Sequence, residues 1–182
     1  MAALCLAHAH SLAAMVARLT VASEKWSDGH EIASGVIERS DGAISDSLAL
    51  ADRDADAFNS VMAAYRMPKN KGFRESRRQA IREATIGAAI VPLETLVSAS
   101  ELLQRLLEMS RECNSNALTD LASSTELAHT AARMAEMNVR INTDYLDGED
   151  VDEIEHSANE TMRRCDATLE EVRASCMSRL GW

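Results

Sequence analysis

The sequence predicts an all-α protein, a bundle of about five helices that forms a single domain over residues 1–182. Only two prolines and seven glycines punctuate the chain, and alanine, leucine, methionine, glutamate and arginine, which favour helices, dominate it. No hairpin dipeptide is flanked by alternating apolar segments, so nothing indicates a sheet. The length is sufficient for one sizeable core.

Breaks in the apolar periodicity divide the chain into its expected helices. These cover about residues 2–22, 30–66, 74–110, 117–141 and 152–179. Gly35 and Gly42 are weak points of the second helix. Pro92 removes one backbone hydrogen bond from the third helix and is expected to kink it. Asn116 is expected to cap the fourth helix.

The composition argues against nucleic-acid and membrane partners. A net charge of −10 and an aromatic content of 3% leave neither a basic surface nor many stacking platforms. The apolar first twenty residues lack a basic start and are interrupted by Arg18, which predicts a buried, alanine-rich helix rather than a targeting or spanning segment. No other segment is expected to enter a membrane.

The cysteines and histidines are expected to be structural. The four cysteines form no C-x-x-C pair, and we interpret them as reduced core thiols of a cytoplasmic protein. The five histidines lack metal-ligand spacing, so no metal site is predicted. His8 falls on the apolar stripe of Leu4, Leu12 and Met15 and is expected to be a core histidine.

Asp54 is the strongest candidate for chemistry. Asp52 and Asp56 share one helical face, whereas Asp54 lies at helical spacing from the apolar stripe that includes Leu50 and Val61. Burial raises the pKa of a carboxyl group, which tunes it as a general acid or base near neutral pH. The alternative is a buried aspartate held by a structural hydrogen bond. We expect Asp54 in a cleft, with Asp52 and Asp56 more exposed.

Five segments resemble one family in their order and spacing. They are SLAAMVARLT (11–20), DRDADAFNSVMAAYRMPKN (52–70), VPLE (91–94), NSNALTD (114–120) and NVRIN (138–142). Over about positions 3–146 the chain resembles the C-terminal domain of formiminotransferase-cyclodeaminase and the stand-alone methenyltetrahydrofolate cyclohydrolases.

The resemblance implies an all-helical homodimer with sites at or near the subunit interface. It implies a tetrahydrofolate derivative as substrate and no permanently bound cofactor. The expected reaction closes 5-formiminotetrahydrofolate to 5,10-methenyltetrahydrofolate with release of ammonia. The alternative is a cyclohydrolase that hydrates the methenyl bridge to 10-formyltetrahydrofolate. Both reactions move a proton, and the family's catalytic aspartate matches Asp54.

The resemblance also marks substrate-binding candidates. They are Lys25, Asn116, Asp120, Asn138, Arg140 and Asn142. Lys25 and Arg140 are equally explained as surface residues, and Asp120 as a favourable charge at a helix N-terminus. Asp120 and Asn138 lie about 27 Å apart along one helix, so a single short ligand needs a second chain to reach both. The basic run 66–78 suits either the folate glutamates or a solvated loop.

Two expectations concern the beginning of the chain. The family carries a Pro-Gly-Gly-Gly-Ser segment before its first core helix, and this sequence starts beyond it, so we expect an N-terminally shortened domain. Because such glycines let backbone approach a ligand, a non-catalytic helical dimer is a further alternative. The chain is expected to form a homodimer through its alanine-rich helices, including residues 2–22.

Overall fold

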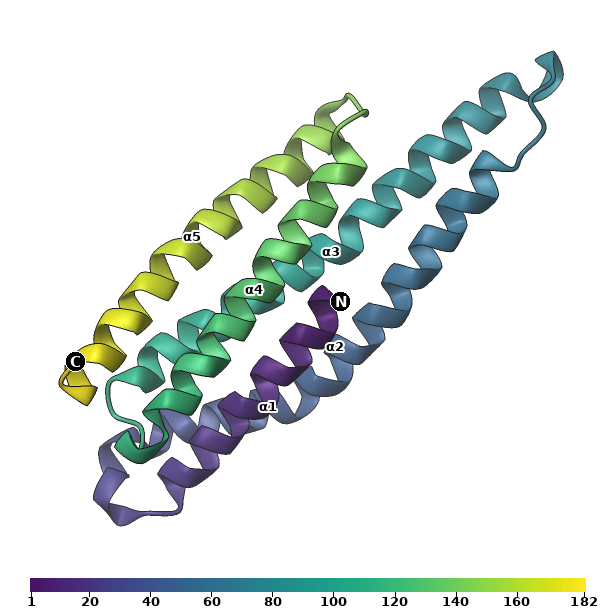
Figure 1. Cartoon of the computed structure of the whole chain (residues 1–182). Helices are drawn as coiled ribbons and strands as arrows, with labels where there is room; N and C mark the ends of the chain where they lie inside the picture. Colours follow the sequence, from purple (N-terminus) through teal and green to yellow (C-terminus); the bar gives the residue numbers. More distant parts are fainter.

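Five α-helices and three short 3-10 helices make up the protein, and its computed structural model describes all of residues 1–182 (Figure 1). The elements in order are α1 (Ala2–Val21), η1 (Glu24–Gly29), α2 (His30–Tyr65), η2 (Lys71–Phe73), α3 (Arg74–Ser110), η3 (Ser115–Ala117), α4 (Leu118–Thr143) and α5 (Glu149–Leu180). There is no strand, so the predicted all-α bundle is confirmed.

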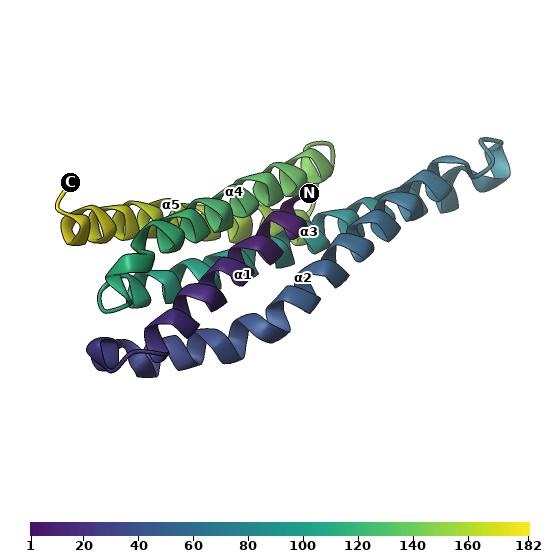
Figure 2. The ribbon, with the colours of Figure 1, turned by 60° about the horizontal axis from the view of Figure 1, so that its bottom comes forward.

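The core forms where α1 packs between α2 and α4, and α3 packs on α2, α4 and α5 (Figures 1 and 2). Small residues let the helices of the bundle pack closely, because many inward positions of α1 and α4 are alanines that are fully buried. They are Ala9, Ala13 and Ala17 on α1 and Ala128, Ala131, Ala132 and Ala135 on α4. The alanines of α1 are thus used inside the chain and are not free for a dimer contact, and the homodimer itself stays a prediction. Only an outer stripe of α1, with Leu4, Met15 and Leu19, stays exposed.

An arm projects from this bundle. We define the arm as residues 52–79, where α2 and α3 continue side by side beyond the start of α1 and turn at η2 (Figures 1 and 2). Only two helices pack together there, so each leaves most of its surface open. Exposed apolar side chains follow: Phe58 is 62% and Tyr65 is 52% accessible, and Met62 and Phe73 are exposed as well.

The buried histidine is not the expected one. His8 is exposed, and its Nδ1 lies 2.8 Å from the carbonyl oxygen of Leu4. His10 is buried instead, because two further residues turn the side chain by about 200° around the helix, towards α2. The cysteines behave as core thiols: three of the four are buried, and burial raises the pKa of Cys176 to about 11.

Two helices are long and apolar enough to span a membrane by length and composition, Ala2–Val21 and the stretch Lys71–Ser110. The second was not expected from the sequence. About half of each apolar window is buried inside the bundle, which is what a core helix requires.

Candidate functional site

Asp54 lies at the rim of a small pocket where four helices meet. Met1 and Ala2 line the pocket from the start of α1, Leu50 lines it from α2, Pro92 from α3 and Asn138 from α4. The segments around Asp54, Pro92 and Asn138, which are far apart in the sequence, therefore converge on one pocket. The expectation that Asp54 is buried is wrong, since it is exposed, as are Asp52 and Asp56.

The position of Asp54 on α2 explains why its predicted burial is wrong. Leu50 and Ala64 are buried, and Ala57 and Val61 are half-buried, so the apolar stripe of α2 does face α3. Asp54 falls beside this stripe at the level where α1 begins, and no helix covers that side of α2. Its carboxylate therefore opens onto the pocket and the solvent.

The neighbouring charges single out Asp54. Arg53 donates hydrogen bonds to both carboxylate oxygens of Glu94, to one of them over 2.8 Å, and this contact lowers the pKa of the Glu94 carboxyl. Glu94 is thus held as an ionised partner that ties α2 to α3. No lysine, arginine or histidine lies within 4 Å of the Asp54 carboxylate. Asp54 is therefore a carboxylate at the pocket without an ion-pair partner.

Asn138 and Asn142 lie close to this pocket but differ in their bonds. The side chain of Asn138 is exposed and donates to the carbonyl of Met134 in its own helix over 2.9 Å. Asn142 is half-buried, and its Nδ2 donates to Ala88 O of α3 over 2.9 Å and to Asn138 O over 2.8 Å. Asn138 is free to turn towards a bound molecule, whereas both amide hydrogens of Asn142 are already used.

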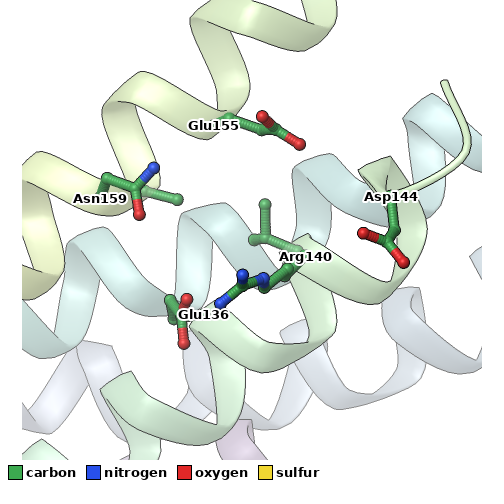
Figure 3. A pocket seen from close by; sticks show the side chains of 7 residues that line it. Glu136, Arg140, Asp144, Glu155 and Asn159 are labelled. Carbon is green, nitrogen blue, oxygen red and sulfur yellow. The ribbon is translucent and has the colours of Figure 1, made fainter. Parts of the chain in front are cut away.

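Arg140 points into a separate and larger pocket between α4 and α5 (Figure 3). This pocket measures about 260 Å³, and three carboxylates, Glu136, Asp144 and Glu155, line it together with Arg140 and Asn159. Three negative charges around one guanidinium do not favour a folate carboxylate. Arg140 and Asp54 therefore do not share a pocket within one chain.

The remaining candidates gather at the far end of the bundle. Lys25 is exposed in η1, with its Nζ 4.7 Å from the centre of the Trp26 ring, and Asn116 is exposed in η3. Asp120 is half-buried in the first turn of α4. This end is separated from Asp54 by the length of α1, about 30 Å for twenty residues. No single chain brings these three side chains to Asp54.

The capping role expected for Asn116 is filled by Asn114. Asn114 Oδ1 accepts a hydrogen bond from the Asn116 backbone N–H over 3.0 Å, so Asn114 caps η3 and the prediction of an Asn116 cap is wrong. Asn114 also bonds the end of α1: its N–H donates to Thr20 Oγ1, and its Nδ2 donates to Leu19 O. No group of three or more histidine, cysteine, aspartate or glutamate residues is placed to hold a metal ion.

Comparison with known proteins agrees with the resemblance. The family model of formiminotransferase-cyclodeaminase matches residues 1–164. A methenyltetrahydrofolate cyclohydrolase from Methylorubrum extorquens is 30% identical over 138 residues, which are 75% of this chain and 66% of that protein. The formimidoyltransferase-cyclodeaminase of Rattus norvegicus is 29% identical over 133 residues, 72% of this chain and 25% of that protein. The matched region thus spans less than two thirds of either relative.

A solved structure shows the same fold. The formiminotetrahydrofolate cyclodeaminase of Thermotoga maritima superposes with a TM-score of 0.89 at 22% identity, over 100% of this chain and 87% of that one. The family model covers nearly the whole sequence, and its match includes all five segments singled out above. The chain belongs to the formiminotransferase-cyclodeaminase family.

Proposed function

We propose that the protein is an enzyme of folate one-carbon metabolism that closes 5-formiminotetrahydrofolate to 5,10-methenyltetrahydrofolate and releases ammonia. The observation that carries this proposal is the convergence of Asp54, Pro92 and Asn138 on one pocket, with Asp54 free of any ion-pair partner. A carboxylate with that freedom suits proton transfer at a bound molecule.

Asp54 serves as the proton carrier of this reaction. N10 of the folate attacks the formimino carbon, which becomes tetrahedral between N5 and N10. Asp54 accepts the proton that N10 loses and returns it to the departing nitrogen, which leaves as ammonia. The formimino nitrogen enters this step protonated, and its positive charge stays on the N5–C–N10 bridge as the methenyl cation, so atoms and charge balance without a further reactant.

The small size of the pocket supports a site that a second chain completes. The pocket of Asp54 measures about 20 Å³, room for about one water molecule, whereas small-molecule sites usually measure about 300–1,000 Å³. A pterin therefore lies over this pocket rather than inside it, and another surface has to cover it. The exposed apolar side chains beside it, Met137 and Ile141 on α4 and Phe58 on the arm, suit a second copy of the chain.

A cyclohydrolase activity is the second candidate, because the relative at 30% identity carries that name. Water then attacks the methenyl carbon, and Asp54 accepts the proton that the water loses. The C–N5 bond breaks as the hydroxyl proton moves to N5, and the formyl group stays on N10. The same residue serves both reactions, so the geometry at Asp54 does not distinguish the two activities. They are distinguished by which of the two substrates the protein converts.

The test is to supply each substrate separately and follow the absorbance of the methenyl chromophore. Ring closure raises this absorbance and hydration lowers it. Asp54→Asn keeps the size of the side chain but cannot accept the proton, so its turnover should fall by about 10²–10⁴-fold with little loss of stability. Asp52→Asn, on the neighbouring face of α2, is the matched control and should retain turnover. Equal turnover of the Asp54→Asn variant and wild type would assign the proton transfer to another residue.

A further inference from the structure

Pro92 leaves a backbone carbonyl of α3 without its usual donor, and Asn142 of α4 donates a hydrogen bond to that carbonyl. Proline has no N–H, so inside α3 it cannot donate to the carbonyl four residues earlier, that of Ala88. Asn142 Nδ2 lies 2.9 Å from that same carbonyl oxygen, across the interface between α3 and α4. The side chain of Asn142 thus supplies the donor that Pro92 removes, and α3 remains one continuous helix through Pro92.

We infer that Asn142 is a positioning residue that holds the α3–α4 wall of the Asp54 pocket, and that it does not contact the folate. This inference rests on the proposed function for its catalytic meaning. Pro92 and Asn138 both line the pocket, and Asn142 is bonded to the helical turn before Pro92, through Ala88 O, and to Asn138 itself, through Asn138 O. The resemblance had marked Asn142 as a substrate-binding residue, and the structure assigns it this different task.

The hydrogen bond from Asn142 to Ala88 O lies in a buried place, where water cannot easily replace the donor. Ala88 is 7% accessible and Pro92 is buried, so water has little access to replace the donor. Both hydrogens of the Asn142 amide are directed at backbone carbonyl oxygens, and only an amide of this length supplies two donors at that place. An aspartate has the same shape but presents oxygen to oxygen, so Asn142→Asp should disturb the wall more than a simple truncation does.

A four-protein cycle tests the inference: wild type, Asn142→Ala, Pro92→Ala and the double variant. Pro92→Ala restores a backbone N–H that can donate to Ala88 O, so Ala88 no longer needs Asn142. In the wild-type background, Asn142→Ala should lower kcat by about tenfold and leave KM within about twofold, as expected for lost alignment. In the Pro92→Ala background, the same substitution should lower kcat by no more than about threefold. An equal loss in both backgrounds, or a loss confined to KM, would make Asn142 a substrate ligand and overturn the inference.

Urea unfolding of the same four proteins is a readout that does not depend on turnover. Asn142→Ala should lower the unfolding midpoint clearly in the wild-type background and less in the Pro92→Ala background. Asn138→Ala is the matched control, because its side chain bonds only Met134 in its own helix, and its effect on the midpoint should be the same in both backgrounds. If wild type turns over neither folate, the proposed function fails, but the unfolding cycle still decides the bond, and equal midpoint shifts overturn it.

Hydrogen exchange tests the positioning role of Asn142 without measuring turnover, and it also serves if Asn142→Ala folds poorly. Asn142→Ser, a milder change, should speed amide exchange in residues 88–96 and 138–143, which form the wall, and leave exchange in residues 168–178 of α5 unchanged, since that segment packs beside Gln104 and Ser110 at the other end of α3. Uniform acceleration over the whole chain would reduce Asn142 to a general stabilising residue and would overturn the positioning role.

Discussion

His10 is a buried titratable side chain with half of its hydrogen-bonding capacity unused. Its Nδ1 lies 3.2 Å from Ser40 Oγ, and its Nε2 has no partner. Burial lowers the pKa of His10 to about 4, and the nearby Arg39 adds to this effect, while Asp46 and Glu101 oppose it. The ring is therefore neutral in the folded protein at neutral pH, and a proton on it destabilises the fold.

The sign of the resulting pH dependence follows from linkage. In the unfolded chain His10 titrates near its ordinary pKa of 6.5, so between pH 6.5 and about 4 the unfolded state binds more protons. The contribution of His10 to stability is complete above pH 6.5 and is lost as the pH falls to about 4. A shift of this size corresponds to about 3 kcal/mol.

His10→Gln should therefore reduce the loss of unfolding free energy between pH 6.5 and 4, measured by urea unfolding at several pH values. His8→Gln is the matched control on the same helix, since His8 is exposed. The control should keep the full pH dependence of wild type. The same slope in His10→Gln as in wild type would show that other groups carry the pH dependence.

At this scale the sequence was a good guide to residue type and a poor guide to side-chain burial. It selected Asp54 among three aspartates, yet predicted it buried, because the number of helices around that turn of α2 is not visible in a single helical period. It placed His8 rather than His10 in the core for a related reason. Helix α1 is covered on two sides, by α2 and α4, and its buried surface is wider than one stripe.

The connection between α1 and α2 depends on a close contact at Gly29. A Cβ on this residue would lie 2.6 Å from the backbone oxygen of Glu112, which is near the end of α3. Backbone cannot rotate aside as a long side chain can, so the two segments would have to separate. Gly42, in the middle of α2, has nothing within 4 Å of the corresponding position.

Opposite effects are therefore expected from the same substitution at these two glycines. Gly29→Ala should destabilise the protein by about 1–3 kcal/mol through overpacking. Gly42→Ala should stabilise it by about 0.5–1 kcal/mol, since alanine has the higher helix propensity and its methyl group meets no neighbour. Urea unfolding of the two variants beside wild type measures both, and a shift in the same direction for both would contradict the contact at Gly29.

Helix limits were predictable because the signals that set them are local. Four of the five expected helices begin and end within about two residues of the observed ones. The fifth starts three residues earlier, at Glu149, because Gly148 has a φ of 134° and ends the preceding turn there. The continuity of α3 through Pro92 could not be predicted, since the donor that replaces its N–H lies 54 residues away from Ala88 along the chain.

The whole molecule places the candidate site residues in two groups. Asp54 and Asn138 lie where α1 begins, and Lys25, Asn116 and Asp120 lie where α1 ends. The distance of about 27 Å between Asp120 and Asn138 exceeds the reach of one short ligand. A site that uses both groups needs a second chain, and the open apolar surfaces of the arm and of α4 are the candidate contacts for it.

The arm is a suitable contact surface for a second chain. Phe58 and Met62 lie one turn apart, and the outer stripe of α1 with Leu4, Met15 and Leu19 offers a complementary apolar surface on the other chain. An isologous contact would use both surfaces twice, and a stable interface buries about 1,000 Å² or more in total. Phe58→Glu together with Met62→Glu should give a monomer by light scattering at micromolar concentration, with unchanged helical circular dichroism. A wild-type monomer, or a dimer that survives this double substitution, would rule out the arm as the interface.

Subunit mixing separates a shared site from one built by a single chain. If Asp54 of one chain and Asp120 of the other serve the same folate, then Asp54→Asn and Asp120→Asn should each be inactive as homodimers. After the two are unfolded together and refolded in equal amounts, half of the dimers are mixed, and each mixed dimer has one site with both aspartates intact. About a quarter of the wild-type turnover should return, because such sites are one in four under random pairing.

Each variant refolded alone is the control and should stay inactive. No recovery in a mixture that light scattering shows to be dimeric would place both aspartates in the same chain's site. The separation between the two groups would then have to be spanned by the substrate itself.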